Sequence, residues 1–151
     1  MKTFDVIALG ELNVDLILNR IAGFPEVGKE IFARDMICTL GSSTAIFAAN
    51  VSALGARTAF AGMIGRDAFG ELVRGSLEAR GVDTRYVIEA ADRATGVTVV
   101  MSYGEDRANV TYPGAMEALR FADLDPEIFL SARHIHLSSL FMQPGLLADI
   151  V

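Results

Sequence analysis

Residues 40–55, "LGSSTAIFAANVSALG", decide the fold and raise the first question about function. A glycine and three small hydroxylated residues precede an apolar run that a second glycine closes. Alanine and leucine favour helix, Ser42 or Ser43 can cap its N-terminus, and Gly55 stands where a helix commonly ends. The stretch therefore predicts a helix over residues 43–54. Because the helix is small or apolar nearly all round, we expect it to be buried.

The same stretch also offers a place for a ligand. Free N–H groups at a helix start, flanked by small residues, let an oxygen-rich molecule approach the backbone closely. A Walker-type loop would need a lysine, and a dinucleotide fingerprint would need G-x-G-x-x-G; the stretch has neither. A capped core helix and a binding floor both remain open from these residues alone.

Outward from this helix, strands and helices alternate. Apolar runs typical of buried strands occur at residues 4–9, 57–65, 84–90 and 134–140, and helix starts occur at Asp67, Pro126 and Pro144. This alternation predicts an α/β fold with a parallel sheet. The β-rich segments 15–21, 31–40, 95–103 and 107–113 have no helices between them, and we expect them to form a separate small sheet over one end of the main sheet.

Composition limits the classes of partner. Of the 151 residues, 52% are hydrophobic and the net charge is −6, which disfavours nucleic acid and anionic membranes as partners. The single cysteine, Cys38, fits a reducing compartment. Neither a secretory signal nor a membrane span is evident, so we expect a soluble cytoplasmic protein.

A carboxylate follows the first predicted strand, in "GELNVD" at residues 10–15. Ligands of open α/β sheets bind beyond the carboxyl ends of the strands. Asn13 and Asp15 lie on one face of an extended segment, where the carboxylate could accept hydrogen bonds from two adjacent hydroxyls. A turn or edge role for Asp15 is equally compatible with the sequence.

Four blocks in this order resemble the ribokinase-like (PfkB) carbohydrate kinases: "VIALGELNVDLIL", "LGSSTAIFAANVSALG", "FAGMIGRDAFGELVRGSLEARGVDT" and "TGVTVVMSYGEDRANVTYPGA". The most distinctive is the third, with G-x-x-G-x-D-x-x-G at Gly62, Gly65, Asp67 and Gly70. The resemblance covers nearly all of residues 1–151 and corresponds to the N-terminal half of the family, so the chain looks truncated. It implies a Rossmann-like, ribokinase-type sheet with a β-sheet lid built from segments at about 15–40 and 95–113.

The resemblance also implies a sugar site between the sheet and the lid. Asp15 and Asn13 would bind hydroxyls, and Gly41 and Ser42 would form the floor. Further candidates to touch the ligand or a partner subunit are Val99, Met101, Asn109 and Thr111 on the lid strands. Ser138 and Ser139, near the end of the chain, fall where many members of the family carry a polar or acidic sugar contact. Family lids often pair, which implies a homodimer formed through the lid.

Three positions depart from the family pattern: Ser42 replaces a second glycine, Ile46 replaces a sugar-binding asparagine, and Met116 replaces the asparagine of "G-A-N". We expect these changes to make the pocket less polar, which would suit an unusual sugar or a nucleoside.

The family's "G-A-G-D" signature, which carries the catalytic base, is absent from these 151 residues. We therefore expect no catalytic residue in this chain, and ATP and Mg²⁺ binding only in the full-length enzyme. His134 and His136 share one strand face without a third ligand, so no metal site is expected. The leading interpretation is the sugar-binding part of an ATP-dependent sugar kinase, inactive by itself. The alternatives are a nucleoside kinase of the same family and a non-catalytic sugar-binding or oligomerising module.

Overall fold

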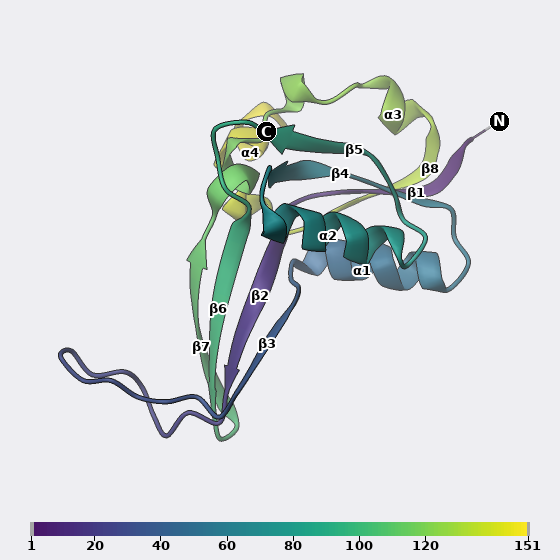
Figure 1. The fold of residues 1–151 in the computed structure, drawn as a ribbon. Helices are drawn as coiled ribbons and strands as arrows, with labels where there is room; N and C mark the ends of the chain where they lie inside the picture. Colours follow the sequence, from purple (N-terminus) through teal and green to yellow (C-terminus); the bar gives the residue numbers. More distant parts are fainter. Residues whose placement is uncertain (1, 151) are drawn as a thin grey trace.

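The computed structural model describes residues 2–150 and contains two sheets (Figure 1). The first sheet is parallel, with the order β5-β4-β1-β8. Its strands are β1 (Phe4–Leu9), β4 (Thr58–Gly65), β5 (Asp83–Ala90) and β8 (Ala132–Leu137). Strand β4 is buried along its whole length, as expected for a central parallel strand covered on both faces. The predicted parallel α/β sheet is confirmed.

Helices cover both faces of this sheet. On one face lie α1 (Ser43–Ala53) and α2 (Ala68–Glu78), side by side in Figure 1. The other face carries short helical segments: η1 (Gly114–Ala118), η2 (Phe121–Asp123), α3 (Glu127–Leu130), η3 (Leu140–Met142) and α4 (Pro144–Ile150). Neighbouring residues of β1 point to opposite faces of the sheet. Ala8 belongs to the hydrophobic cluster that includes residues of α1 and α2, whereas Ile7 belongs to the cluster on the other face. Among residues 2–150 no helix is long and apolar enough to cross a membrane.

The second sheet, which we call the lid, has the order β3-β2-β6-β7. Its strands are β2 (Asn13–Asn19), β3 (Asp35–Leu40), β6 (Gly96–Tyr103) and β7 (Asp106–Tyr112). It hangs from the end of the parallel sheet where β1 and β4 finish (Figure 1). The β6–β7 hairpin therefore belongs to the lid and not to the main sheet, as the sequence predicts.

The third sequence block holds the lid against the α/β unit. The Asp67 carboxylate accepts hydrogen bonds from Gly70 N (2.8 Å), Thr95 N (2.8 Å) and Thr95 Oγ1 (2.7 Å). Burial alone would raise the pKa of Asp67, but these hydrogen bonds outweigh it and keep the pKa below its ordinary value. Asp67 is thus the cap of α2, as expected, and also the anchor of the residue that precedes β6.

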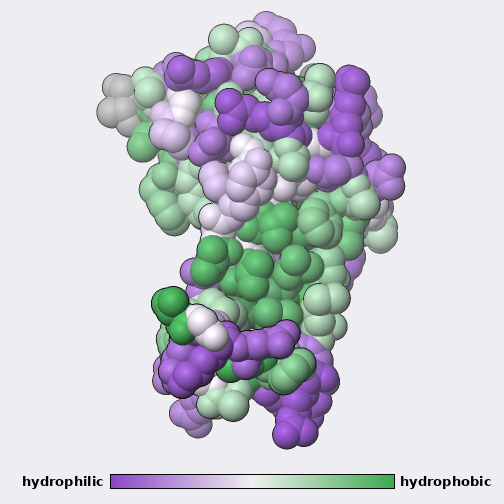
Figure 2. Space-filling view, turned by 60° about the vertical axis from the view of Figure 1, so that its left-hand side comes forward, coloured by the Kyte–Doolittle hydropathy of each residue, from purple (hydrophilic) through white to green (hydrophobic). Residues whose placement is uncertain are grey.

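Strand alternation gives the lid one apolar face. The registers of the four strands place these residues on it: Leu16, Leu18, Met36, Cys38, Val99, Met101, Val110 and Tyr112. We call them the apolar lid face. Figure 2 shows hydrophobic side chains gathered over the lid, between polar surfaces at the two ends of the molecule. Met36, Val110 and Tyr112 are 65%, 61% and 55% exposed, so part of this face is unprotected in the single chain.

Some element boundaries differ from the sequence-based expectation. The strand expected at 31–40 begins at Asp35, because the preceding residues belong to a long loop that projects from the lid (Figure 1). The strand expected at 134–140 ends at Leu137, since Ser139 adopts a left-handed conformation with φ 51° that breaks the extended backbone. The helix expected after Asp125 is only four residues long.

Candidate functional site

The candidate site lies where β2, the start of α1 and the lid meet. Asn13 and Asp15 point from the same face of β2, and the Asn13 Nδ2 atom donates to Asp15 Oδ1 over 3.0 Å. Gly41 lies directly against both side chains: a Cβ placed on it would be 2.4 Å from Asp15 Oδ1 and 2.5 Å from Asn13 Nδ2. A glycine is therefore required here for the carboxylate to keep its position. The predicted convergence of Asp15 with the 41–42 turn is present in the structure.

Hydroxyl and amide groups of the lid extend this polar surface. Asn13 Nδ2 also donates to Thr98 Oγ1 (3.0 Å), and Thr98 Oγ1 lies 3.1 Å from Thr111 Oγ1. The β6–β7 register pairs Thr98 with Thr111 and Val100 with Asn109, so these residues share the face that carries Asp15. The result is a row of carboxylate, amide and hydroxyl groups across three strands.

The start of α1 is fixed by a second polar network. Ser42 has a positive φ of 68°, and its Oγ donates to the Glu11 carbonyl (2.7 Å) and accepts from Ala45 N (2.9 Å). The Glu11 carboxylate, in a residue only 2% exposed, accepts from Ser43 N, Ser43 Oγ and Thr44 Oγ1 at 3.1, 3.1 and 2.8 Å. These contacts tie the end of β1 to the helix that carries the floor.

The two networks line one open pocket of about 340 Å³. Its lining residues are Glu11, Asn13, Asp15, Ser42, Ser43, Thr98, Val100, Arg107, Asn109, Thr111, Ser139 and Met142. This volume lies within the range of small-molecule sites. Carboxylate and amide oxygens that accept hydrogen bonds, beside hydroxyl and amide groups that donate them, match the needs of a polyhydroxylated ligand.

Six predicted residues line this pocket, namely Asn13, Asp15, Ser42, Asn109, Thr111 and Ser139, and Gly41 lies beneath Asp15. Ser138 lies next to the pocket, with its Oγ 2.6 Å from Thr44 Oγ1 and 3.2 Å from Ser43 Oγ. Sequence reasoning missed Glu11, Ser43, Thr98, Val100, Arg107 and Met142. Strand alternation from Asn109 and Thr111 could have identified Thr98, once the hairpin register was known.

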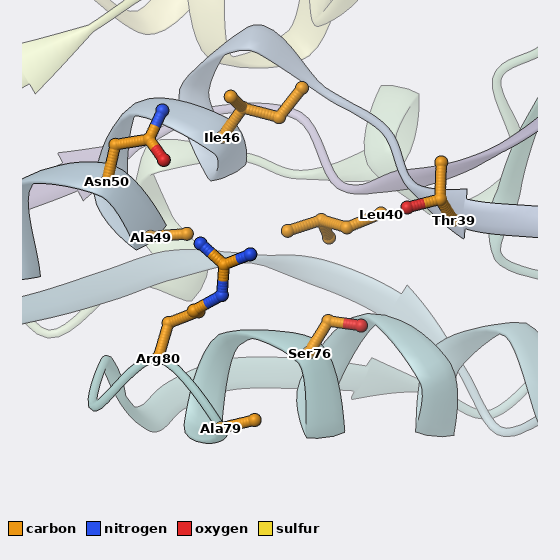
Figure 3. A pocket seen from close by; sticks show the side chains of 8 residues that line it. All are labelled: Thr39, Leu40, Ile46, Ala49, Asn50, Ser76, Ala79 and Arg80. Carbon is orange, nitrogen blue, oxygen red and sulfur yellow. The ribbon is translucent and has the colours of Figure 1, made fainter. Parts of the chain in front are cut away.

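Three predicted residues lie outside this pocket. Ile46 lines a separate groove between α1 and α2, together with Asn50 one helical turn further along α1 (Figure 3). Met101 pairs with Ala108, not with Asn109, and so belongs to the apolar lid face, as does Val99. The Met116 substitution does not alter the pocket surface either, since Met116 is fully buried. Ile46 and Met116 therefore do not make this pocket less polar.

The charge of Asp15 depends on its surroundings. Burial raises the pKa of Asp15, and the hydrogen bond from Asn13 and the positive charge of Arg107 partly oppose that rise. Arg107 forms no ion pair with another residue of the described range 2–150, so its charge is available to the pocket.

No group of three or more potential metal ligands (His, Cys, Asp or Glu) occurs among residues 2–150. His136 instead stacks on Phe47 with a centroid separation of 3.6 Å and an interplanar angle of 16°.

Comparisons with known proteins agree with this geometry. A nucleoside kinase from Methanothermobacter thermautotrophicus is 29% identical over 136 residues, which is 89% of this chain and 44% of that kinase. A fructokinase from Halothermothrix orenii shares the fold with a TM-score of 0.79 and 25% identity, over 97% of this chain and 52% of the fructokinase. An E. coli protein assigned as a ribokinase II, solved with ATP and Mg²⁺, has a TM-score of 0.77 and 27% identity over 91% of this chain and 44% of its own.

The chain thus spans about half the length of these relatives or less. The family model of the pfkB family carbohydrate kinases matches residues 3–151. A parallel sheet, a β-sheet lid and a polar pocket between them accompany that match, and the chain belongs to the pfkB family of carbohydrate kinases.

Proposed function

We propose that this chain is the sugar-binding part of an ATP-dependent kinase that phosphorylates a hydroxyl group of a sugar or a nucleoside. The observation that carries the proposal is the contact of Asp15 and Asn13 with the side-chain-free Gly41, beneath the hydroxyl groups of the lid. In this site Asp15 accepts hydrogen bonds from two neighbouring hydroxyls of the ligand. Asn13, Asn109 and Thr111 bind the remaining polar groups, and Ser42 supports the floor.

The catalytic base and the ATP and Mg²⁺ sites lie outside residues 1–151 in this proposal. The observation that supports it is that the sequence contains no "G-A-G-D". Phosphoryl transfer depends on positioning and on stabilisation of charge. Residues 1–151 alone would therefore transfer no phosphoryl group.

A free sugar and a nucleoside are both supported as substrates. The nucleoside kinase and the fructokinase share comparable identity with this chain, at 29% and 25%. Molecules of both classes carry adjacent hydroxyl groups that can donate hydrogen bonds to Asp15. Val100 and Met142 contribute apolar surface to the pocket, which suits the base of a nucleoside. The single cysteine fits an enzyme of the reducing cytoplasm.

The apolar lid face supports a homodimer. Its exposed members, Met36, Val110 and Tyr112, form a patch that a second copy of the lid would bury. The opposite face of each lid would remain over its own pocket.

The kinase proposal is tested with the full-length natural gene product, ATP, Mg²⁺ and a panel of sugars and nucleosides. We expect ADP formation that depends on one member of the panel, and loss of that activity by at least about 100-fold in Asp15→Asn, because the neutral amide replaces a charged acceptor. ADP formation no higher than background with every sugar and nucleoside would contradict the proposal. A thermal shift with the same panel separates binding from catalysis.

A further inference from the structure

A second hollow lies outside the pocket described above. It has a volume of about 480 Å³ and is bounded by α1, α2 and the end of β3 (Figure 3). The residues that line it are Thr39, Leu40, Ile46, Ala49, Asn50, Ser76, Ala79 and Arg80. We call it the α1–α2 groove. It shares no lining residue with the pocket at Asp15, and Thr39, the partner of Asp15 across β2 and β3, stands next to that pocket.

The polar atoms of the groove are rich in hydrogen-bond donors. Arg80 is the only charged residue of the lining, and no acidic residue is among them. Figure 3 shows Arg80 reaching from the end of α2 toward Asn50 of α1. Hydroxyl groups of Ser76 and Thr39 add two further donors on other sides. The groove is thus locally positive in a chain whose net charge is −6.

These polar groups are not used by the fold. Within residues 2–150, the side chains of Arg80, Asn50, Ser76 and Thr39 form no hydrogen bond or ion pair with one another or with other residues, whereas eight other arginines of the same range form ion pairs. A cation after a helix C-terminus stabilises the helix dipole, which accounts for a positive charge at position 80. It does not account for an amide and two hydroxyls around the same hollow.

We propose that the α1–α2 groove binds a small anionic molecule that carries a phosphate or carboxylate group. Arg80 forms a bidentate charge-assisted contact with the anion, and Asn50 and Ser76 donate to its remaining oxygens. Leu40, Ile46 and Ala49 provide an apolar wall for the uncharged part of the molecule. This site does not depend on the proposed kinase function, because none of its residues contributes to the pocket that holds Asp15.

The groove borders both the α/β unit and the lid. Thr39 and Leu40 end β3 immediately before the Gly41–Ser42 floor. The other lining residues belong to α1, to α2 or to the two positions that follow α2, Ala79 and Arg80. A molecule bound there contacts the lid strand and both helices at once.

The test uses the full-length protein and two probes, inorganic phosphate and citrate, with glycerol as the uncharged control, measured by isothermal titration calorimetry. Arg80→Gln removes the charge. Arg34→Gln is the matched control, since Arg34 also lacks an ion pair within residues 2–150 but directly precedes β3 and does not line the groove. Ala79→Trp fills the groove and keeps Arg80, and because Ala79 is exposed, the core is untouched.

We expect at least one anion to bind, with affinity that falls as salt rises and that drops about tenfold or more in both Arg80→Gln and Ala79→Trp but not in Arg34→Gln. The anion that binds more tightly identifies the phosphate or the carboxylate class. The proposal is overturned if neither probe binds at millimolar concentration, or if binding survives in Arg80→Gln. Loss of binding in Arg80→Gln but not in Ala79→Trp would show charge attraction outside the groove and would overturn it as well. Thermal unfolding of each variant verifies that the fold is retained.

Discussion

Replacement of Gly41 by alanine perturbs the candidate site where the backbone of Gly41 lies against the side chains of Asp15 and Asn13. The new Cβ would lie 2.4 Å from Asp15 Oδ1, 2.5 Å from Asn13 Nδ2 and 2.9 Å from Asp15 Cγ. Ordinary contact between a carbon and these atoms begins near 3.4 Å. The Asp15 carboxylate must therefore move by about 1 Å, which is enough to lose a hydrogen bond to a ligand.

The stability of the fold should change little, because the atoms that must move are the ends of side chains. Gly41 is also not among the glycines with positive φ, so alanine fits its backbone. Binding should suffer more. Hydrogen bonds to a charged group contribute about 1.5–3 kcal/mol each, so losing one or two costs about 3 kcal/mol. That corresponds to roughly 150-fold weaker binding of the hydroxylated ligand.

Calorimetric titration of the full-length protein with the preferred sugar or nucleoside measures this loss, and thermal unfolding monitors the fold. Gly75→Ala is the matched control: nothing lies within 4 Å of its added Cβ, and alanine in the middle of α2 should stabilise the helix by about 1 kcal/mol. Unchanged affinity in Gly41→Ala, with the fold intact, would show that Asp15 does not hold the ligand.

Three further outcomes follow from the same structure. Asp67→Asn should lower the unfolding free energy by about 1–2 kcal/mol above pH 5, because the charged carboxylate that accepts hydrogen bonds from Gly70 and Thr95 is lost. The deficit should shrink at lower pH, because the pKa of Asp67 is depressed and its contribution vanishes as the wild-type carboxylate is protonated; a deficit independent of pH would contradict this. Ligand affinity should fall on acidification as Asp15 becomes protonated. Because the pKa of Asp15 is raised, this fall should occur at a pH above 3.8, the ordinary pKa of an aspartate, and a pH-independent affinity would refute it. If the proposed homodimer forms through the apolar lid face, Val110→Lys should shift sedimentation from dimer to monomer, because an ammonium group cannot be buried unpaired; a dimer unchanged by this substitution would contradict the proposed interface.

Much of the fold was predictable because local signals agree with the tertiary structure. The caps of α1 and α2, Ser42 and Asp67, lie at the predicted helix starts and accept from Ala45 N and Gly70 N. The division into a parallel sheet and a separate lid follows from the presence or absence of helices between strands. Boundaries were less predictable where no side chain marks them: the end of β8 depends on the backbone conformation of Ser139.

The candidate site was predictable where its residues lie in one segment of the chain. It was less predictable where the position of a residue depends on how two strands pair. Asp15 and Asn13 follow a strand and share a face by simple alternation. Met101 was predicted to touch the ligand or a partner subunit, and the hairpin register, which cannot be derived from the β-rich segments alone, places it on the apolar lid face and not in the pocket. Ile46 was assigned to the pocket from its family position, whereas the turn of α1 carries it to the α1–α2 groove. Glu11 is held by side chains 32 and 33 positions away, a contact that only the folded chain reveals.

The most direct test of the central claim is a crystal structure of the full-length protein with the sugar or nucleoside that it phosphorylates. We predict that an Asp15 carboxylate oxygen lies about 2.5–3.0 Å from a ligand hydroxyl, with the ligand resting on Gly41 and Ser42 beneath the lid. A ligand bound elsewhere, or one that reaches the floor without contacting Asp15, would contradict the proposed site.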